Sequence, residues 1–217
     1  MRKWFALSVV AIVLAGAVGV ASAQMGMRRP QMKGVWSPVV GAGAVYQMET
    51  PREGTSEIEF AVVGAQTVEG KPGFWLEMVT NDPRAGGEMI MKMLMVHEEK
   101  SLEVKRMIMK AGGEDAMEFP MQMAQMGGRA PQNAAADIRD DGVLIGTESV
   151  TTPAGTFSCQ HYQAKDKSWD AWVSDKVPPY NIVKAVSKDS TMTLTRVLTN
   201  AKTRITGPVK PFSFESP

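Results

Sequence analysis

The chain has 217 residues, a formal net charge of +1 and 44% hydrophobic residues, with 17 methionines against seven phenylalanines. This length allows one domain with a substantial core, and the near-neutral charge gives no electrostatic footprint for nucleic acid. The single cysteine, Cys159, excludes a disulfide framework within the chain. Stability must therefore come from the burial of apolar side chains.

The first 23 residues have the features of a secretory signal peptide. Arg2 and Lys3 give a positive start, an apolar run follows at Leu7–Val20, and Ala21–Ala23 supplies small residues for cleavage. The apolar run is shorter than the ~20 residues of a spanning helix. We therefore expect cleavage after Ala23, a periplasmic or secreted protein, and a mature chain without a transmembrane segment.

Residues 24–34 show neither a helix nor a strand period and are predicted to form a flexible N-terminal arm. From 35 to 217 the pattern predicts one β domain. Ile58, Phe60 and Val62, for example, alternate with polar or small neighbours, as in a half-buried strand. Short connections between such runs favour antiparallel hairpins over βαβ units. Strands are predicted at 44–50, 57–63, 74–79, 89–97, 102–110, 142–151, 156–164, 168–174, 182–187, 191–200 and 202–205.

An insertion at 114–141 interrupts this pattern. Met117 and Met121 fall at helical spacing, which predicts a short helix, and Pro120 breaks or kinks it. Residues 127–141 are rich in Gly, Ala, Pro and Asn and are predicted to form a mobile connection. The fold class is therefore mainly β, with a single antiparallel sheet and a short helical insertion.

The sequence shows no catalytic constellation. It has two histidines, His97 and His161, and lacks a serine-hydrolase elbow, a zinc-protease helix motif, a Cys-x-x-Cys pair and a phosphate-binding glycine loop. We therefore expect a non-enzymatic protein. Cys159 lies two residues from His161, but two ligands do not form a structural metal site, and a lone cysteine packs as a small apolar side chain.

Between residues 89 and 97 every second residue is a soft or nitrogen donor. Met89, Met91, Met93, Met95 and His97 form this methionine ladder. Because side chains alternate across a β-strand, all five point to one face if the run is a strand.

The first interpretation of the ladder is one wall of an apolar concavity. Thioethers on flexible stems adapt to irregular apolar surfaces and to varied ligands. The protein would then bind a hydrophobic small molecule or an acyl chain, without a cofactor, and Glu114–Met126 would lie across the opening as a lid. The candidate ligand-binding residues are Phe74, Leu76, Met78, Met91, Met93, Met95, Met107 and Met109.

The second interpretation is a copper site, because soft thioethers select Cu(I) and imidazole also binds copper. Its ligands would be Met91, Met93, Met95 and His97. A third interpretation is a structural or protein-interaction module without a small ligand, which would have a packed interior and an exposed apolar patch elsewhere.

The register of the next strand distinguishes these interpretations. If Met93 pairs with Met107, then Met91 pairs with Met109 and the thioethers gather in one patch. A slip of one residue changes the face of every partner side chain and brings Arg106 into the patch, which would disfavour a bound cation. The sequence alone leaves both registers open.

A family resemblance is visible between residues 151 and 184. The run TTPAGTFSC at 151–159, followed by Trp172-Val173-Ser174, Val177-Pro178 and Ile182-Val183-Lys184, is similar to uncharacterised secreted bacterial β-rich proteins. These in turn resemble the periplasmic lipoprotein carriers LolA and LolB. The resemblance implies a curved antiparallel half-barrel closed by helices, with an apolar cavity for acyl chains. Another envelope protein is a further partner to expect.

Overall fold

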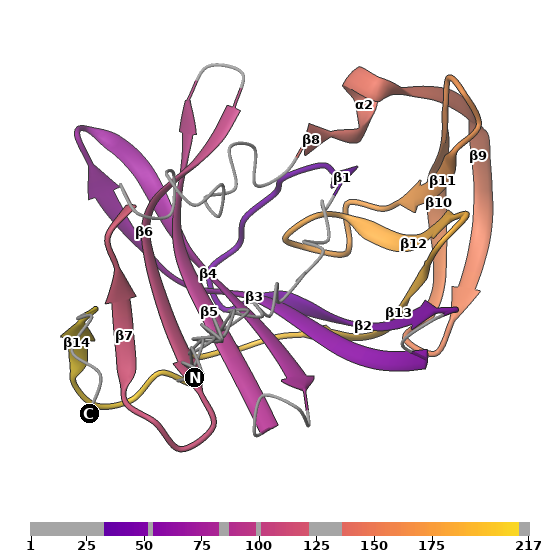
Figure 1. The fold of residues 1–217 in the computed structure, drawn as a ribbon. Coiled ribbons are helices and arrows are strands. Elements are labelled where there is room, and N and C mark those ends of the chain that lie inside the picture. Colours follow the sequence, from indigo (N-terminus) through magenta and orange to yellow (C-terminus); the bar gives the residue numbers. More distant parts are fainter. Residues whose placement is uncertain (1–32, 52–53, 83–86, 99–100, 122–135, 213–217) are drawn as a thin grey trace, which may run out of the picture. The chain divides into compact units, whose positions relative to one another are not determined.

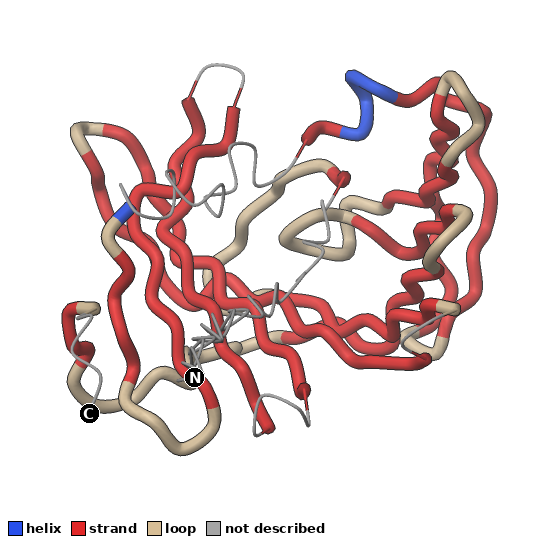
Figure 2. The backbone as a smooth tube through the Cα atoms, in the orientation of Figure 1, coloured by secondary structure: helices blue, strands red, loops and turns tan. Residues whose placement is uncertain are grey.

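A computed structural model describes residues 33–51, 54–82, 87–98, 101–121 and 136–212. The predicted signal peptide at 1–23, residues 24–32 of the predicted arm and residues 122–135 of the predicted insertion lie outside these ranges. Most of the described chain forms one twelve-stranded sheet (Figures 1 and 2).

The sheet is almost entirely antiparallel. Its order is β14-β7-β6-β5-β4-β3-β2-β13-β12-β11-β10-β9, and only β14 and β7 run parallel. A separate parallel pair joins β1 (Lys33–Gly34) to β8 (Ala136–Asp137), and α2 (Ile138–Asp141) follows β8. The strands of the sheet are β2 (Gly43–Thr50), β3 (Gly54–Val68), β4 (Lys71–Asp82), β5 (Gly87–Glu98), β6 (Ser101–Ala111), β7 (Ala116–Phe119), β9 (Gly142–Thr152), β10 (Gly155–Ala164), β11 (Trp169–Val173), β12 (Ile182–Ser187), β13 (Thr191–Leu198) and β14 (Val209–Pro211).

The sheet is strongly curved. Strands β9 and β13 approach within 8 Å between Cα atoms, although three strands separate them in the sheet order. Side chains from β2–β6, β10, β12 and β13 share one hydrophobic cluster, which defines the inner face. There Phe60 packs edge-to-face with Tyr46 and Tyr180, and the Tyr46 hydroxyl donates to the Ile182 carbonyl at 2.9 Å. The predicted fold class is confirmed.

Alternation along the strands explains which side chains reach the inner face. Ile58, Phe60 and Val62 of β3 are all buried there, as predicted. Trp169 and Trp172 of β11 are three residues apart and therefore take opposite sides. Trp172 packs against the inner cluster, and Trp169 packs outside it in a small cluster beneath α2.

The outer face of β4 and β5 is covered by the chain segment that follows β13. The carboxylate of Glu77, 2% exposed, accepts hydrogen bonds from Thr203 Oγ1 at 2.6 Å and from the Arg204 backbone N–H at 2.8 Å. Lys92 Nζ donates to Thr203 Oγ1 at 3.0 Å. We call these contacts the C-terminal clasp. An apolar cluster lies beside it: Val79, Ile90, Ile108, Ala116 and Ile205.

Four local predictions are wrong. Residues 202–205, predicted as a strand, have no strand structure, because they form the clasp. Residues 116–119, predicted as the start of a helix, form β7 and pair with β6. Lys33–Gly34, assigned to the irregular arm, forms β1. Within the predicted insertion, β8 and α2 account for 136–141, which were expected to be a mobile connection.

Candidate functional site

The methionine ladder lies on β5, between β4 and β6. Strand β5 pairs with β4 without interruption from Gly87 to Val96, so the alternation of the ladder is preserved. Met93 lies opposite Leu76 on β4 and opposite Met107 on β6. Met91 lies opposite Met109. The register is therefore the one that gathers the thioethers on one face.

All eight candidate ligand-binding residues lie on this face of β4–β6, but they differ in exposure. Leu76, Met93, Met95 and Met107 are between 0% and 6% exposed and form part of the inner hydrophobic cluster. The other four are half-buried and pack against its margin: Phe74, Met78, Met91 and Met109. We call these eight residues the methionine face. Its buried floor is bordered by Phe74, opposite Met95, at one end and by an accessible margin of Met78, Met91 and Met109 at the other.

The cationic residues of β5 and β6 lie on the opposite face. Arg106 pairs with Leu94, away from the ladder, and forms hydrogen bonds of 2.7 and 2.8 Å with the Glu118 carboxylate. Arg106 and Lys92 both lie over the Trp75 ring, 5.3 and 5.2 Å from its centroid. Partial burial lowers the pKa of Lys92, although the neighbouring Glu77 charge opposes this shift. Neither cation therefore faces the thioethers.

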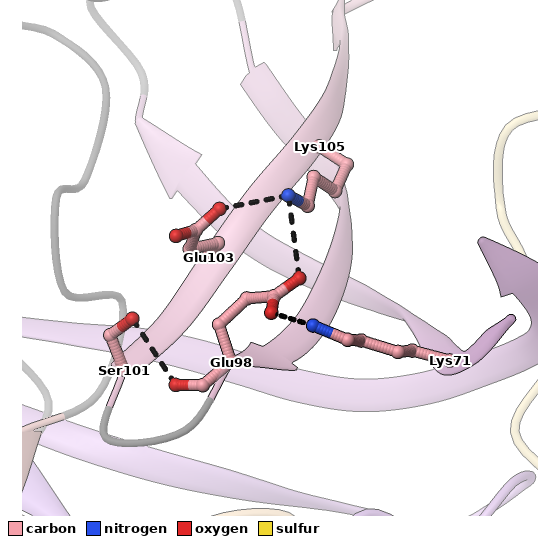
Figure 3. A network of polar contacts seen from close by, with 5 residues as sticks. All are labelled: Lys71, Glu98, Ser101, Glu103 and Lys105. Atoms are coloured by element: carbon pink, nitrogen blue, oxygen red, sulfur yellow. Dashed lines mark hydrogen bonds and ion pairs between the residues drawn. The ribbon is translucent and has the colours of Figure 1, made fainter. Parts of the chain in front are cut away.

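The His97 end of the ladder meets a polar network at the turn between β5 and β6, shown in Figure 3. Lys71 pairs with Glu98, and Lys105 Nζ lies 2.9 Å from Glu103 and 3.5 Å from Glu98. The hydrogen bond from Lys71 lowers the pKa of the Glu98 carboxyl. Ser101 Oγ also donates to the Glu98 carbonyl at 3.4 Å. This end of the ladder is charged and solvated.

The four residues predicted as copper ligands are spread along β5. From Met91 to His97 the strand advances six residues, or about 20 Å at the usual rise. Met93 and Met95 are buried in the core, whereas His97 is exposed and pairs with Leu102. The structure therefore does not bring these four side chains to one point. In the described part of the chain, no group of three or more His, Cys, Asp or Glu side chains could hold a metal ion.

A second polar arrangement, which sequence reasoning missed, surrounds His161. Its Nε2 lies 2.8 Å from Asp170 Oδ1, its Nδ1 lies 3.2 Å from Glu148 Oε1, and its ring stacks on Trp172 at 4.4 Å between centroids. These partners come from β9 and β11, on either side of β10, so only the strand pairing brings them to His161. Nearby Cys159 is 1% exposed, and burial raises its pKa to about 11. It behaves as the apolar side chain that we predicted.

A groove of about 490 Å³ lies at the edge of the sheet beyond β6. Phe119, one of its lining residues, pairs across the sheet with Met107 of the methionine face, and it stacks on Phe212 at 4.6 Å. The groove is lined by Lys105, Arg106, Glu118, Phe119, Pro120, Met121, Val209, Pro211 and Phe212. No helix among the described residues is long and apolar enough to cross a bilayer.

Comparison with known proteins gives distant likenesses. No protein-family model and no curated protein sequence matches the chain. One similar solved structure is a Bacteroides fragilis protein described as exported and as having a YmcC-like fold, at 14% identity and a TM-score of 0.40, over 76% of this chain and 99% of that one. Another is a Parabacteroides distasonis protein described as a lipoprotein, at 15% identity and a TM-score of 0.38, over the same shares of the two chains.

Proposed function

We propose that this is an exported, non-enzymatic protein that binds a hydrophobic ligand, such as an acyl chain, against the methionine face. The observation that carries the proposal is the half-buried margin at Met78, Met91 and Met109. These side chains lie on a closed apolar floor and retain accessible surface.

The chemistry of the margin suits a flexible ligand. Methionine has an unbranched stem and a polarisable sulfur, so several thioethers side by side can adjust to chains of different length and shape. The cations Lys92 and Arg106 are held on the opposite face, so they would not disturb an apolar contact.

A groove also lies beside β7, next to Met107 at the buried floor of the methionine face. Its volume of about 490 Å³ is within the ~300–1,000 Å³ typical of small-ligand sites. Phe119 and Met121 connect its apolar lining to Met107 across the sheet. The resemblance of residues 151–184 to secreted β-rich proteins agrees with export.

The test is titration of the purified full-length protein with a fluorescent C16 fatty acid. In the variant Met91→Glu, about half of the ~1.5–3 kcal/mol of a buried methionine is lost and a charge enters the face, so affinity should fall about tenfold or more. The matched control is Met48→Glu, because Met48 is also half-buried but lies on β2 opposite Met192. Wild-type protein that fails to bind the probe, or equal losses in the two variants, would contradict the proposal.

A second candidate function, a protein-interaction module, is favoured by the other edge of the sheet. Among the described strands β9 pairs only with β10, and it exposes Val143, Leu144 and Ile145 to between 48% and 55%. Open strand edges pair readily with a strand of another chain. The partner we propose is a second copy of the chain, since Glu148 is the only charged residue of β9 and two antiparallel copies can pair without facing like charges.

This candidate predicts a concentration-dependent dimer in light scattering, abolished by Leu144→Lys. The variant His97→Lys, which places the same charge at an exposed site on another strand, should leave the dimer intact. A wild-type protein that stays monomeric at high concentration would exclude this function.

A further inference from the structure

The strand register creates a row of methionines that runs across the sheet. Met78 of β4 lies opposite Met91 of β5, Met91 opposite Met109 of β6, and Met109 opposite Met117 of β7. We call these four residues the methionine row. All four are half-buried, in contrast to the buried pair Met93 and Met107 in the next row.

The spacing across a sheet suits metal coordination better than the spacing along a strand. Neighbouring strands lie about 4.8 Å apart, whereas successive side chains on one face of a strand lie about 6.6 Å apart. Three ligands around one ion, with metal–sulfur bonds of about 2.3 Å as in zinc thiolates, place their sulfurs about 4 Å apart. Adjacent members of the row therefore start near this separation, whereas Met78 and Met109 are two strands, or about 9.6 Å, apart and reach one ion only through their long, flexible side chains.

The environment of the row is compatible with a soft cation. Lys92 and Arg106 lie on the other face of the sheet. At the β14 end of the row Lys210 lies opposite Met117, and its charge is balanced by an ion pair with Asp115. At the β3 end of the row, the buried aromatic side chain of Phe60 lies opposite Met78. Half-burial gives an ion access while it removes much of the competing water.

We propose that the methionine row is a Cu(I)-binding site with Met78, Met91 and Met109 as its thioether ligands. Thioethers favour Cu(I) over harder divalent ions, because both partners are soft and polarisable. The site differs from the copper ligands that the sequence predicts along β5, because Met93, Met95 and His97 do not take part. The row coincides with the margin of the proposed apolar-ligand site, but copper binding depends on the sulfur donors and not on apolar area.

The experiment is a titration of the full-length protein with Cu(I) alone, under anaerobic reducing conditions, in competition with a chromophoric Cu(I) chelator. Wild type should bind about one equivalent, and Met91→Leu and Met109→Leu should each lose at least about tenfold in affinity. Leucine keeps the apolar volume, so these variants should remain folded, which thermal unfolding will check. X-ray absorption of the copper should show a shell of sulfur neighbours only.

Three control variants test the assignment. Met95→Leu removes a thioether of the same strand outside the row, His97→Asn removes the imidazole of the ladder, and Cys159→Ser removes the thiol. All three should bind copper as wild type does. The proposal is overturned by a wild type that takes up no copper, by row variants with unchanged affinity, by an equal loss in any control, or by nitrogen in the copper shell. The fatty-acid probe is titrated separately on the wild type: copper uptake without probe binding overturns only the apolar-ligand proposal, and probe binding without copper uptake overturns only this one.

Discussion

The substitution Glu77→Ala tests how strongly the C-terminal clasp supports the sheet that carries the methionine face. Glu77 is 2% exposed, and its carboxylate accepts from Thr203 Oγ1 and from the Arg204 backbone N–H, at 2.6 and 2.8 Å. Hydrogen bonds to charged groups contribute roughly 1.5–3 kcal/mol each. Removing the buried charge offsets part of this loss, because that charge costs desolvation energy in the folded protein.

The net expectation is a loss of about 3 kcal/mol in the free energy of unfolding, since both donors, Thr203 Oγ1 and the Arg204 backbone N–H, lose their acceptor. For a domain of this size each kcal/mol corresponds to about 2–4 °C, so the melting temperature should fall by roughly 6–12 °C. Glu77→Gln keeps the shape and one acceptor, and its loss should be about half as large.

The assay is urea unfolding followed by circular dichroism, with thermal unfolding as a second measurement. The matched control is Glu57→Ala, because Glu57 is an exposed glutamate on the adjacent strand β3. Its unfolding free energy should stay within about 0.5 kcal/mol of wild type. A Glu77→Ala protein as stable as this control would refute the assignment of the clasp as a stabilising contact.

Three further predictions concern the core and its margins. Leu76→Ala should lower the free energy of unfolding by about 2–5 kcal/mol in urea titrations, because Leu76 is 0% exposed, whereas Leu144→Ala at an exposed site should have little effect. Because burial raises the pKa of Cys159 to about 11, a thiol reagent at pH 8 should label the native protein slowly and the urea-unfolded protein fully; rapid native labelling would contradict this. The hydrogen bond from Arg106 lowers the pKa of Glu118 below its usual 4.5, so the pair stabilises the fold above that pH and loses the effect as the pH falls through the folded pKa. Arg106→Met should therefore cost less than about 1 kcal/mol at pH 7, since both side chains are substantially exposed, and the difference from wild type should vanish in acid.

Alternation made the strands of the inner face predictable. Ile58, Phe60 and Val62 repeat with period two, and so do Met91 and Met93, because each strand has a buried side and a different second side. The same alternation in β4, β5 and β6 determines which residues belong to the methionine face.

Pairing between strands was not predictable from local pattern. The row from Met78 to Met117 depends on the β5–β6 register, which shifts between Leu94 and Met95. No local residue preference marks this shift, so the sequence allowed the alternative register that would have exposed Arg106 to the thioethers. The partners of His161 could not be predicted for the same reason, since they come from the two strands that flank β10.

The predictions for short segments were wrong where tertiary contacts overrode the local sequence pattern. The spacing of Met117 and Met121 suggested a helix, but Met117 and Phe119 also repeat with period two, and pairing with β6 decides in favour of strand β7 at Ala116–Phe119. Residues 202–205 alternate like a strand, yet Thr203 and Arg204 bind Glu77 in place of a neighbouring backbone. Neither outcome can be predicted without knowing which part of the fold each segment packs against.

The pairing of β2 with β13 has a consequence for the order of assembly. Strands β2–β7 are consecutive hairpins, so their contacts are close in sequence and can form while the chain is still emerging. Strand β2 receives its second neighbour only when residues near 191–198 arrive, roughly 145 residues later. Until then the nascent meander carries an open edge at β2, next to a surface rich in methionine. A chain made from its N-terminus is therefore prone to aggregate through this open edge until residues 191–198 pair with β2.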